Sequence, residues 1–281
     1  MSDATRIAVV GAGTMGAGVA YVFAAAGCSV ELVDAEARQL DTAQDIIATQ
    51  ADRARQKGKL DAAAADALPS RVQPRDALQD LPKGLDLVIE AVPERAELKR
   101  EVLGAAEDRE PEVLASNTSG ISIDDLAGGL RRPEAFLGLH FFNPVWAMPL
   151  LEIIHGAATS NKVLDWAQRT GAQIGKETIL VRNVPGFATS RLGVAIGLEG
   201  IRMLEEEVAD TADIDKAMEL GYKHPMGPLR LTDLVGLDVR MDIARHLASV
   251  HGPRFEPPQL LVDKVAAGET GKKAGRGFYT W

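Results

Sequence analysis

Cysteine is almost absent from this sequence, because Cys28 is the only one among 281 residues. A single cysteine excludes an intrachain disulfide, and chains without disulfides are typical of reducing compartments. The sequence also lacks any apolar run of about 18 residues or more, so we expect no transmembrane helix. The short polar segment before Arg6 does not have the apolar stretch of a signal peptide. Together these absences predict a cytoplasmic protein.

Positive charge is also in deficit, since 31 Lys and Arg residues face 40 Asp and Glu residues and the net charge is −9. An acidic chain is poorly suited to bind nucleic acid or an anionic membrane, so we expect neither partner. An anionic ligand would need a local cluster of basic residues. The hydrophobic fraction of 46% is that of an ordinary globular protein, and the length suits two domains.

A glycine-rich motif follows the first apolar run of the chain. Arg6–Val10 (RIAVV) predicts a buried strand, and a helix-compatible stretch follows the motif. In a G-x-G-x-x-G turn, the first glycine permits a tight turn, the second lets backbone approach a pyrophosphate, and the third lets helix pack on strand. These glycines are Gly11, Gly13 and Gly16. A tight turn in any α/β protein is the simpler alternative, but the flanking strand and helix favour a dinucleotide site.

Asp34 ends the next apolar run, Ser29–Val33, and predicts which dinucleotide binds. A carboxylate at this position accepts hydrogen bonds from both ribose hydroxyls and repels a 2′-phosphate. Ala35 supplies no arginine that would compensate a phosphate, although Arg38 lies one helical turn further on. We therefore expect NAD as the cofactor and not NADP.

Strand-like and helix-like segments alternate up to about residue 183. After Asp34 we expect strands at residues 85–92, at 113–116, in the two apolar runs of 137–154, and at 177–181. We expect helices in two pieces over 35–68, in the segment that starts at 96, at 121–130 and at 162–174. This alternation predicts an α/β fold, a Rossmann-type doubly wound and mostly parallel sheet. Ligands of such sheets lie beyond the carboxyl ends of the strands. Polar residues near those ends are Asp34, Glu94, Asn117, Ser119 and His140.

From residue 184 the pattern is helical only, with expected helices at 188–208, 211–220, 229–249 and 257–267. We therefore expect an NAD-binding Rossmann-like domain over residues 1–183 and an all-α domain over residues 184–281. A helical domain of this size buries only a limited core on its own. Its Gly and Leu residues on helix faces suggest packing against a second copy, so we expect a homodimer through this domain.

Two ionisable residues, His140 and Glu152, lie within the apolar stretch 137–154, which turns at Asn143-Pro144. A buried carboxylate is costly unless it is paired, and a carboxylate partner orients a histidine. If the two runs are adjacent strands, the pair forms a general base that removes a proton from a substrate hydroxyl. The alternative is a core histidine satisfied by backbone and an unrelated edge glutamate. The shared crevice at the strand ends favours the general base.

Four basic residues cluster where the long helical segment 35–68 is expected to break, at Arg53, Arg55, Lys57 and Lys59. Most charge clusters of this kind are solvated helix ends. In a chain with so little positive charge, this cluster is also the best candidate for contact with a phosphate-rich ligand.

Seven motifs occur in order along the chain: GAGTMG from Gly11, SNTSG from Ser116, GLHFFNP from Gly138, LLEI from Leu150, VPGF from Val184, PMGPL from Pro225 and GKKAGRGFY from Gly271. With them the chain resembles the short-chain 3-hydroxyacyl-CoA dehydrogenases, closest to the bacterial 3-hydroxybutyryl-CoA dehydrogenase branch. The resemblance implies reversible, NAD-dependent oxidation of a 3-hydroxyacyl-CoA, a Rossmann domain and a helical dimerisation domain. It implies no metal ion.

The resemblance also implies roles for individual residues. His140 is the base, Glu152 is its partner, and Ser119 orients the substrate. The implied cofactor contacts are Gly11, Gly13, Thr14, Met15, Gly16, Asp34, Glu94, Lys99, Asn117 and Asn143. Arg53 and Lys59 occupy the region where the family binds CoA.

The sequence departs from the family at the substrate side. Ser190 stands where the family carries an asparagine that helps to hold the substrate, and a hydroxyl has a shorter reach than an amide. Trp146 and Pro149 replace a frequent proline and a frequent lysine around the turn before the second apolar run. We still expect Ser190 to contact the substrate, with an altered geometry at the acyl end.

Two alternatives remain beside this prediction. A related sugar-acid dehydrogenase of the gulonate type would keep the fold and the base but oxidise a free hydroxy acid, which the basic cluster and the HFFNP motif disfavour. A non-catalytic NAD-binding protein would not need His140 and Glu152. The motifs leave open the acyl chain length, the direction of the reaction and the use of a dicarboxylic acyl group.

Overall fold

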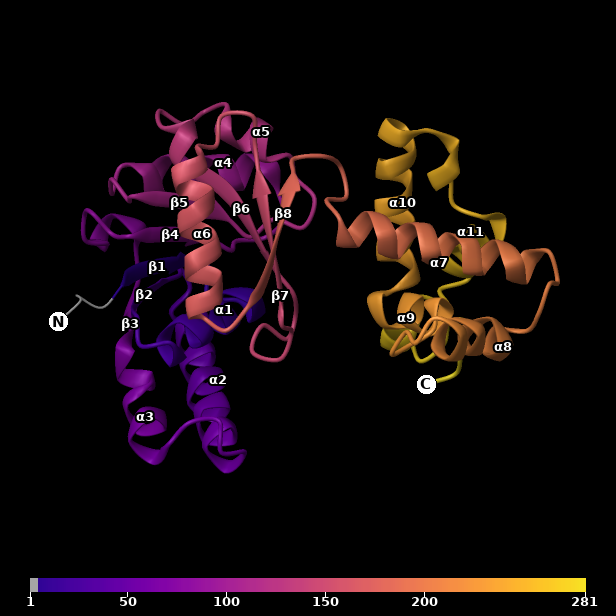
Figure 1. Cartoon of the computed structure of the whole chain (residues 1–281), viewed down its shortest axis with the longest axis horizontal. Helices are drawn as coiled ribbons and strands as arrows, with labels where there is room; N and C mark the ends of the chain where they lie inside the picture. The colour runs from indigo at the N-terminus through magenta and orange to yellow at the C-terminus, as the bar shows by residue number, and fades with distance from the viewer. Residues whose placement is uncertain (1–4) are drawn as a thin grey trace. The chain divides into compact units, whose positions relative to one another are not determined.

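In the computed structural model the chain forms two compact units, Met1–Asn183 and Val184–Trp281. An eight-stranded sheet forms the centre of the first unit (Figure 1). The structure describes residues 5–281. The strands are β1 (Arg6–Val10), β2 (Ser29–Val33), β3 (Val72–Arg75), β4 (Leu87–Glu90), β5 (Val113–Ser116), β6 (Phe136–Phe141), β7 (Leu150–His155) and β8 (Glu177–Arg182).

The strands are ordered β3-β2-β1-β4-β5-β6-β7-β8, and all neighbouring pairs are parallel except β6 and β7. The expected doubly wound, mostly parallel sheet is therefore confirmed. The chain winds outward from β1 through β2 to β3, then returns to the other side of β1 at β4. This reversal leaves a crevice beyond the carboxyl ends of β1 and β4, where open α/β sheets bind their ligands.

The described residues of this unit form six α-helices: α1 (Thr14–Ala25), α2 (Ala37–Gln56), α3 (Ala62–Ala67), α4 (Ala96–Glu107), α5 (Ile123–Ala127) and α6 (Asn161–Gln173). Alternate strand residues such as Val9, Leu32 and Leu139 form one core with α1, α2 and α6. Gly138, which has the opposite parity, faces Ile123 of α5. The sheet thus has helices on both faces, as the alternation of strand and helix predicts.

Strand β3 was not predicted from the sequence, where no element was expected between residue 68 and residue 85. Its sequence, VQPR, contains a proline and two polar side chains, so it lacks the apolar run of a central strand. It pairs only with β2 and forms the edge of the sheet. The strand expected at 85–92 and the helix expected at 121–130 were too long at both ends. Strand β4 covers only Leu87–Glu90, and helix α5 covers only Ile123–Ala127.

The second unit contains α7 (Thr189–Glu205), α8 (Thr211–Lys216), α9 (Pro228–Val235), α10 (Leu237–His251) and α11 (Gln259–Ala266), which share a core of residues such as Leu198, Leu229 and Leu247. The prediction of a single helix over residues 229–249 was wrong. This segment forms the two helices α9 and α10, which meet at Gly236. Gly236 has a φ of 103°, which a residue with a side chain adopts only with strain.

The carboxylate of Asp233 fastens the C-terminal tail to α9. It accepts hydrogen bonds from the backbone N–H groups of Phe278 and Tyr279 and from Nε1 of Trp281. Tyr279 in turn donates to Asp215, at 2.7 Å between the two oxygens. The tail therefore belongs to the packed part of the helical unit. None of the helices in the described part of the chain combines the length and the hydropathy that a membrane crossing requires.

Candidate active site

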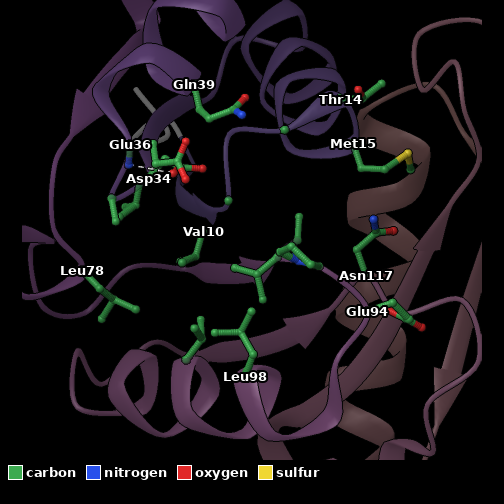
Figure 2. Close-up of a pocket in the computed structure, with 18 of the residues that line it drawn as sticks. Val10, Thr14, Met15, Asp34, Glu36, Gln39, Leu78, Glu94, Leu98 and Asn117 are labelled. Carbon is green, nitrogen blue, oxygen red and sulfur yellow. Dashed lines mark hydrogen bonds between the residues drawn. The ribbon is translucent and has the colours of Figure 1, made fainter.

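A cavity of about 940 Å³ lies beyond the carboxyl ends of the central strands, where the strand order reverses. Most of the site residues expected from the sequence line it: Gly11, Gly13, Thr14, Met15, Asp34, Glu94, Asn117, Ser119, His140 and Asn143. Figure 2 shows Asp34 and Glu36 on one side and Met15, Asn117 and Glu94 on the other, with Val10 between them. The volume is that of a pocket for a sizeable organic ligand.

The glycine turn between β1 and α1 has the backbone that a diphosphate site needs. Gly11 has a φ of 106°, and a Cβ on Gly16 would lie 1.7 Å from the Gly11 oxygen, so neither position accepts a side chain. At Gly13 a Cβ would meet nothing within 4 Å, because this backbone borders the cavity. Helix α1 begins at Thr14, so its positive end points at the same place.

Asp34 is fixed at the far wall of the cavity by two backbone donors. Its Oδ2 accepts from the Ala12 N–H at 2.7 Å and its Oδ1 from the Glu36 N–H at 2.9 Å. The carboxylate therefore ties the glycine turn to the end of β2 while it lines the cavity. A glycine turn for a diphosphate and a fixed carboxylate for a ribose are the features that NAD requires, so these residues fit that cofactor.

His140 and Glu152 face each other directly across the antiparallel pair β6 and β7. Nδ1 of His140 lies 2.7 Å from Oε2 of Glu152, and the two residues are 6% and 0% exposed. His140 also lines the cavity, and the Phe142 ring packs 4.4 Å from the imidazole, centroid to centroid. When Nδ1 donates to the carboxylate, Nε2 is the nitrogen that exchanges a proton, and the carboxylate stabilises the imidazolium.

The SNTSG loop after β5 is held by side chains that were expected to contact the cofactor. Oδ1 of Asn117 accepts from the Phe141 N–H at 3.0 Å, which joins this loop to the residue next to His140. Oε1 of Glu94 accepts from Oγ1 of Thr118 at 2.6 Å and from the Ser119 N–H at 2.9 Å. Asn117 and Glu94 thus fix the position of Ser119 at the cavity wall.

Lys99 does not line the cavity and is fully buried. Its Nζ donates to Oε1 of Glu90 at 2.7 Å and to the Val92 oxygen at 3.1 Å, and it lies 3.3 Å from Oε2 of Glu94. Ser116 donates to the other oxygen of Glu90 at 2.6 Å. Lys99 therefore supports the strand ends that carry the site, and its contact with the cofactor stays a prediction.

Glu90 and Lys176 also stabilise the backbone around the site, and neither was predicted from the sequence. Glu90 is a fully buried carboxylate in the strand LVIE, and the rule that drew attention to Glu152 applies to it equally. Lys176 donates to the carbonyls of Val145 and Met148 and so fastens the loop that follows Asn143. Burial lowers the pKa of Lys176. No sequence pattern marks Lys176, because its partners are backbone atoms.

Three expected substrate contacts lie outside the cavity lining. Arg53 is in the last turn of α2, and Lys59 follows Gly58, where the helical segment breaks as expected; both are exposed. The neighbouring Arg55 pairs with Asp52 instead. Ser190 is in the first turn of α7, in the second unit. Their contacts with the substrate stay predictions.

Comparison with known proteins assigns both units. Residues 6–184 match the family model described as "3-hydroxyacyl-CoA dehydrogenase, NAD binding domain" and residues 186–281 match the C-terminal domain of the same family. A 3-hydroxybutyryl-CoA dehydrogenase of Mycobacterium tuberculosis is 40% identical over 288 residues, covering 100% of both chains. A 3-hydroxyadipyl-CoA dehydrogenase of Escherichia coli is 38% identical over 100% of this chain and 60% of its own length.

A solved structure has the same fold throughout. The crystal structure of (S)-3-hydroxybutyryl-CoA dehydrogenase from Ralstonia eutropha superposes with a TM-score of 0.95, at 37% identity over 99% of each chain. The resemblance drawn from the motifs is confirmed by these matches, and the expected NAD-dependent oxidoreductase is confirmed with it. The chain belongs to the 3-hydroxyacyl-CoA dehydrogenase family.

Proposed function

We propose that this protein catalyses the reversible oxidation of (S)-3-hydroxyacyl-CoA to 3-ketoacyl-CoA with NAD, that 3-hydroxybutyryl-CoA is a substrate, and that His140 is the general base. The observation that supports it most is the 2.7 Å contact between His140 and Glu152 at the wall of the cavity that begins at the glycine turn. In this proposal, a base held by a buried carboxylate acts beside a dinucleotide site.

His140 removes the proton of the substrate's C3 hydroxyl through Nε2, and Glu152 stabilises the positive charge that the imidazole gains. General base catalysis of this kind typically contributes about a hundredfold to ten-thousandfold in rate. Ser119 orients the substrate oxygen at the same wall, and Glu94 and Asn117 hold its loop. In the reverse direction His140 returns the proton to the C3 oxygen.

NAD supplies the hydride chemistry at C3 when it is bound. The chain's part is to hold it: the turn from Gly11 to Gly16 with the positive end of α1 receives the diphosphate, and Asp34 receives the ribose. The cavity lining at Thr14, Met15 and Asn143 supports the rest of the cofactor site. Lys99 and Glu90 support this site through the strand ends that they fix, and a direct contact of Lys99 with the cofactor stays a prediction.

The proposal extends to the substrate's other end and to assembly. Arg53 and Lys59 bind the phosphates of CoA, and Ser190 orients the acyl group. The chain forms a homodimer through the second unit, which exposes large apolar side chains at Leu192, Leu220 and Tyr222. The single cysteine and the lack of charge suited to membranes support a cytoplasmic location.

Oxidation of NADH with acetoacetyl-CoA tests the reaction. The protein should turn over this substrate and should not turn over acetoacetate, which has no CoA. Turnover of a free keto acid in its place would favour the sugar-acid alternative. NADH binding without turnover of either compound would indicate a non-catalytic protein.

A further inference from the structure

Two acidic residues that the proposed reaction does not use, Glu36 and Asp76, line the same cavity as Asp34. Figure 2 shows Asp34 and Glu36 at the same end of the cavity. The backbone N–H of Glu36 donates to Oδ1 of Asp34 at 2.9 Å, so the two residues are held next to each other. The far wall of the cavity therefore carries more negative charge than Asp34 alone supplies.

The register of the sheet brings Asp76 to this wall as well. Val33 of β2 and Arg75 of β3 are Cα partners in the parallel pair, and Asp34 and Asp76 directly follow them. The Asp34 N–H donates to the Arg75 oxygen at 3.2 Å, which extends the pairing beyond the last residue of β2. Because neighbouring strands lie about 4.8 Å apart, two acidic residues leave the sheet side by side.

No positive side chain offsets these carboxylates at the cavity wall. Among the described residues that line the cavity, none is a lysine or an arginine. Arg75 lies outside the lining, and its Nε donates to Oε2 of Glu31 at 2.6 Å. Arg38, the other cation near the end of β2 in sequence, is exposed and also lies outside the lining. A phosphate at this wall would thus meet three carboxylates and no cation from the lining.

We propose that Glu36 and Asp76 are further determinants of cofactor specificity, and that together with Asp34 they exclude NADP by repelling its 2′-phosphate. This inference rests on the proposed function, in which Asp34 receives the ribose that carries this phosphate in NADP. The diphosphate does not distinguish the two cofactors, because both have it and the glycine turn receives it through backbone N–H groups.

The strength of the repulsion indicates why one carboxylate is not enough. Two like charges about 5 Å apart in water change a dissociation constant roughly threefold to tenfold. A single exposed carboxylate therefore discriminates only modestly against the phosphate. Three at one wall multiply their effects, so the preference for NAD should persist when any one of them is neutralised.

Fluorescence titration with NADH and NADPH tests this inference through binding, without turnover. The wild type should bind NADH more tightly. Glu36→Gln and Asp76→Asn should each lower the ratio of the NADPH Kd to the NADH Kd about threefold to tenfold. Asp34→Asn should also lower the ratio but leave NADH preferred, because the other two carboxylates remain. The variant that carries all three substitutions should bind the two nucleotides within about fivefold of each other.

Two control variants separate charge from shape. Asp41→Asn neutralises an exposed acid of α2 that does not line the cavity, and it should leave the Kd ratio unchanged. Asp76→Glu keeps the charge and should hold the ratio within about twofold of the wild type. High salt screens exposed charges, so it should narrow the ratio of the wild type more than that of the triple variant. A purely structural role for these residues would not give this difference in salt dependence.

Other outcomes overturn the inference. If Asp34→Asn alone makes the two Kd values equal, or if Glu36→Gln and Asp76→Asn leave the ratio unchanged, Asp34 selects the cofactor by itself. A wild type that binds NADPH as tightly as NADH refutes the inference but not the proposed reaction, provided that acetoacetyl-CoA still oxidises NADH. If the Kd ratios follow the prediction while acetoacetyl-CoA is not reduced, the proposed function fails and this inference stands.

Discussion

The two units hold their buried carboxylates with different partners. In the first unit, the buried carboxylates of Glu90 and Glu152 each have a cationic or imidazole partner at 2.7 Å, and those pairs lie at or behind the wall of the cavity. In the second unit, the buried carboxylate of Asp233 accepts from backbone N–H groups and the Trp281 indole of the C-terminal tail, and the Nε of the buried Arg240 has no hydrogen-bond partner among the described residues. The buried pairs of the first unit hold the candidate site in shape, whereas the buried carboxylate of the second unit holds the end of the chain in place.

His140 should show the largest effect, because in the proposed reaction it is the paired group that contacts the substrate. We expect His140→Ala to lower kcat with acetoacetyl-CoA about a hundredfold to ten-thousandfold, since a general base is lost. The Kd for NADH, measured by fluorescence titration, should be unchanged, because in the proposed function the glycine turn and Asp34 hold the nucleotide. An active His140→Ala enzyme would mean that the histidine is a core residue only.

Replacing Lys99 breaks the other buried pair and should lower the stability of the fold. Lys99→Met leaves the Glu90 carboxylate without its ammonium, which should lower the free energy of unfolding in urea by about 3–5 kcal/mol. Lys83→Met is the matched control, because Lys83 and Glu110 form a pair that is 58% and 67% exposed and should contribute about 1 kcal/mol or less. Equal losses in the two variants would show that burial of the pair does not matter.

The pairing of His140 and Glu152 was predictable from sequence, whereas the pairing of Glu90 and Lys99 was not predicted. The first pair lies in two apolar runs joined by a short turn, so adjacency in sequence implies adjacency in the sheet. Glu90 and Lys99 lie on a strand and the following helix, and only the packing of α4 brings Nζ back to the strand end. The burial of Arg240 follows from the packing of α10 against α7, which no local sequence pattern records.

Asp34 differs from the buried pairs, because it is partly exposed and its partners are backbone donors. Asp34→Asn keeps the shape but removes the charge that repels a 2′-phosphate. The ratio of kcat/KM for NAD to that for NADP should fall about tenfold or more, the scale of a hydrogen bond to a charged group. Asp41→Asn, at an exposed position of α2, should leave the ratio unchanged. A wild type that prefers NADP would contradict the role of Asp34.

Lys59 should show the smallest effect, because it is exposed and its charge is screened. Lys59→Ala should raise KM for acetoacetyl-CoA about twofold to fivefold with kcat unchanged, since an exposed ion pair contributes about 1 kcal/mol at most. The difference should shrink in high salt. Lys83→Ala, which removes an exposed lysine elsewhere, is the control. If KM does not change at low salt, the basic cluster is a solvated helix end.

The most direct test of the account is a double-mutant cycle on His140 and Glu152, because it asks whether the buried pair works as one unit. Glu152→Gln keeps the shape and removes the charge that stabilises the imidazolium, so it should lower kcat by itself. Since the glutamate acts through the histidine, the double variant should be little slower than His140→Ala alone. Losses in kcat that simply multiply would contradict the account, because Glu152 would then act on something other than His140.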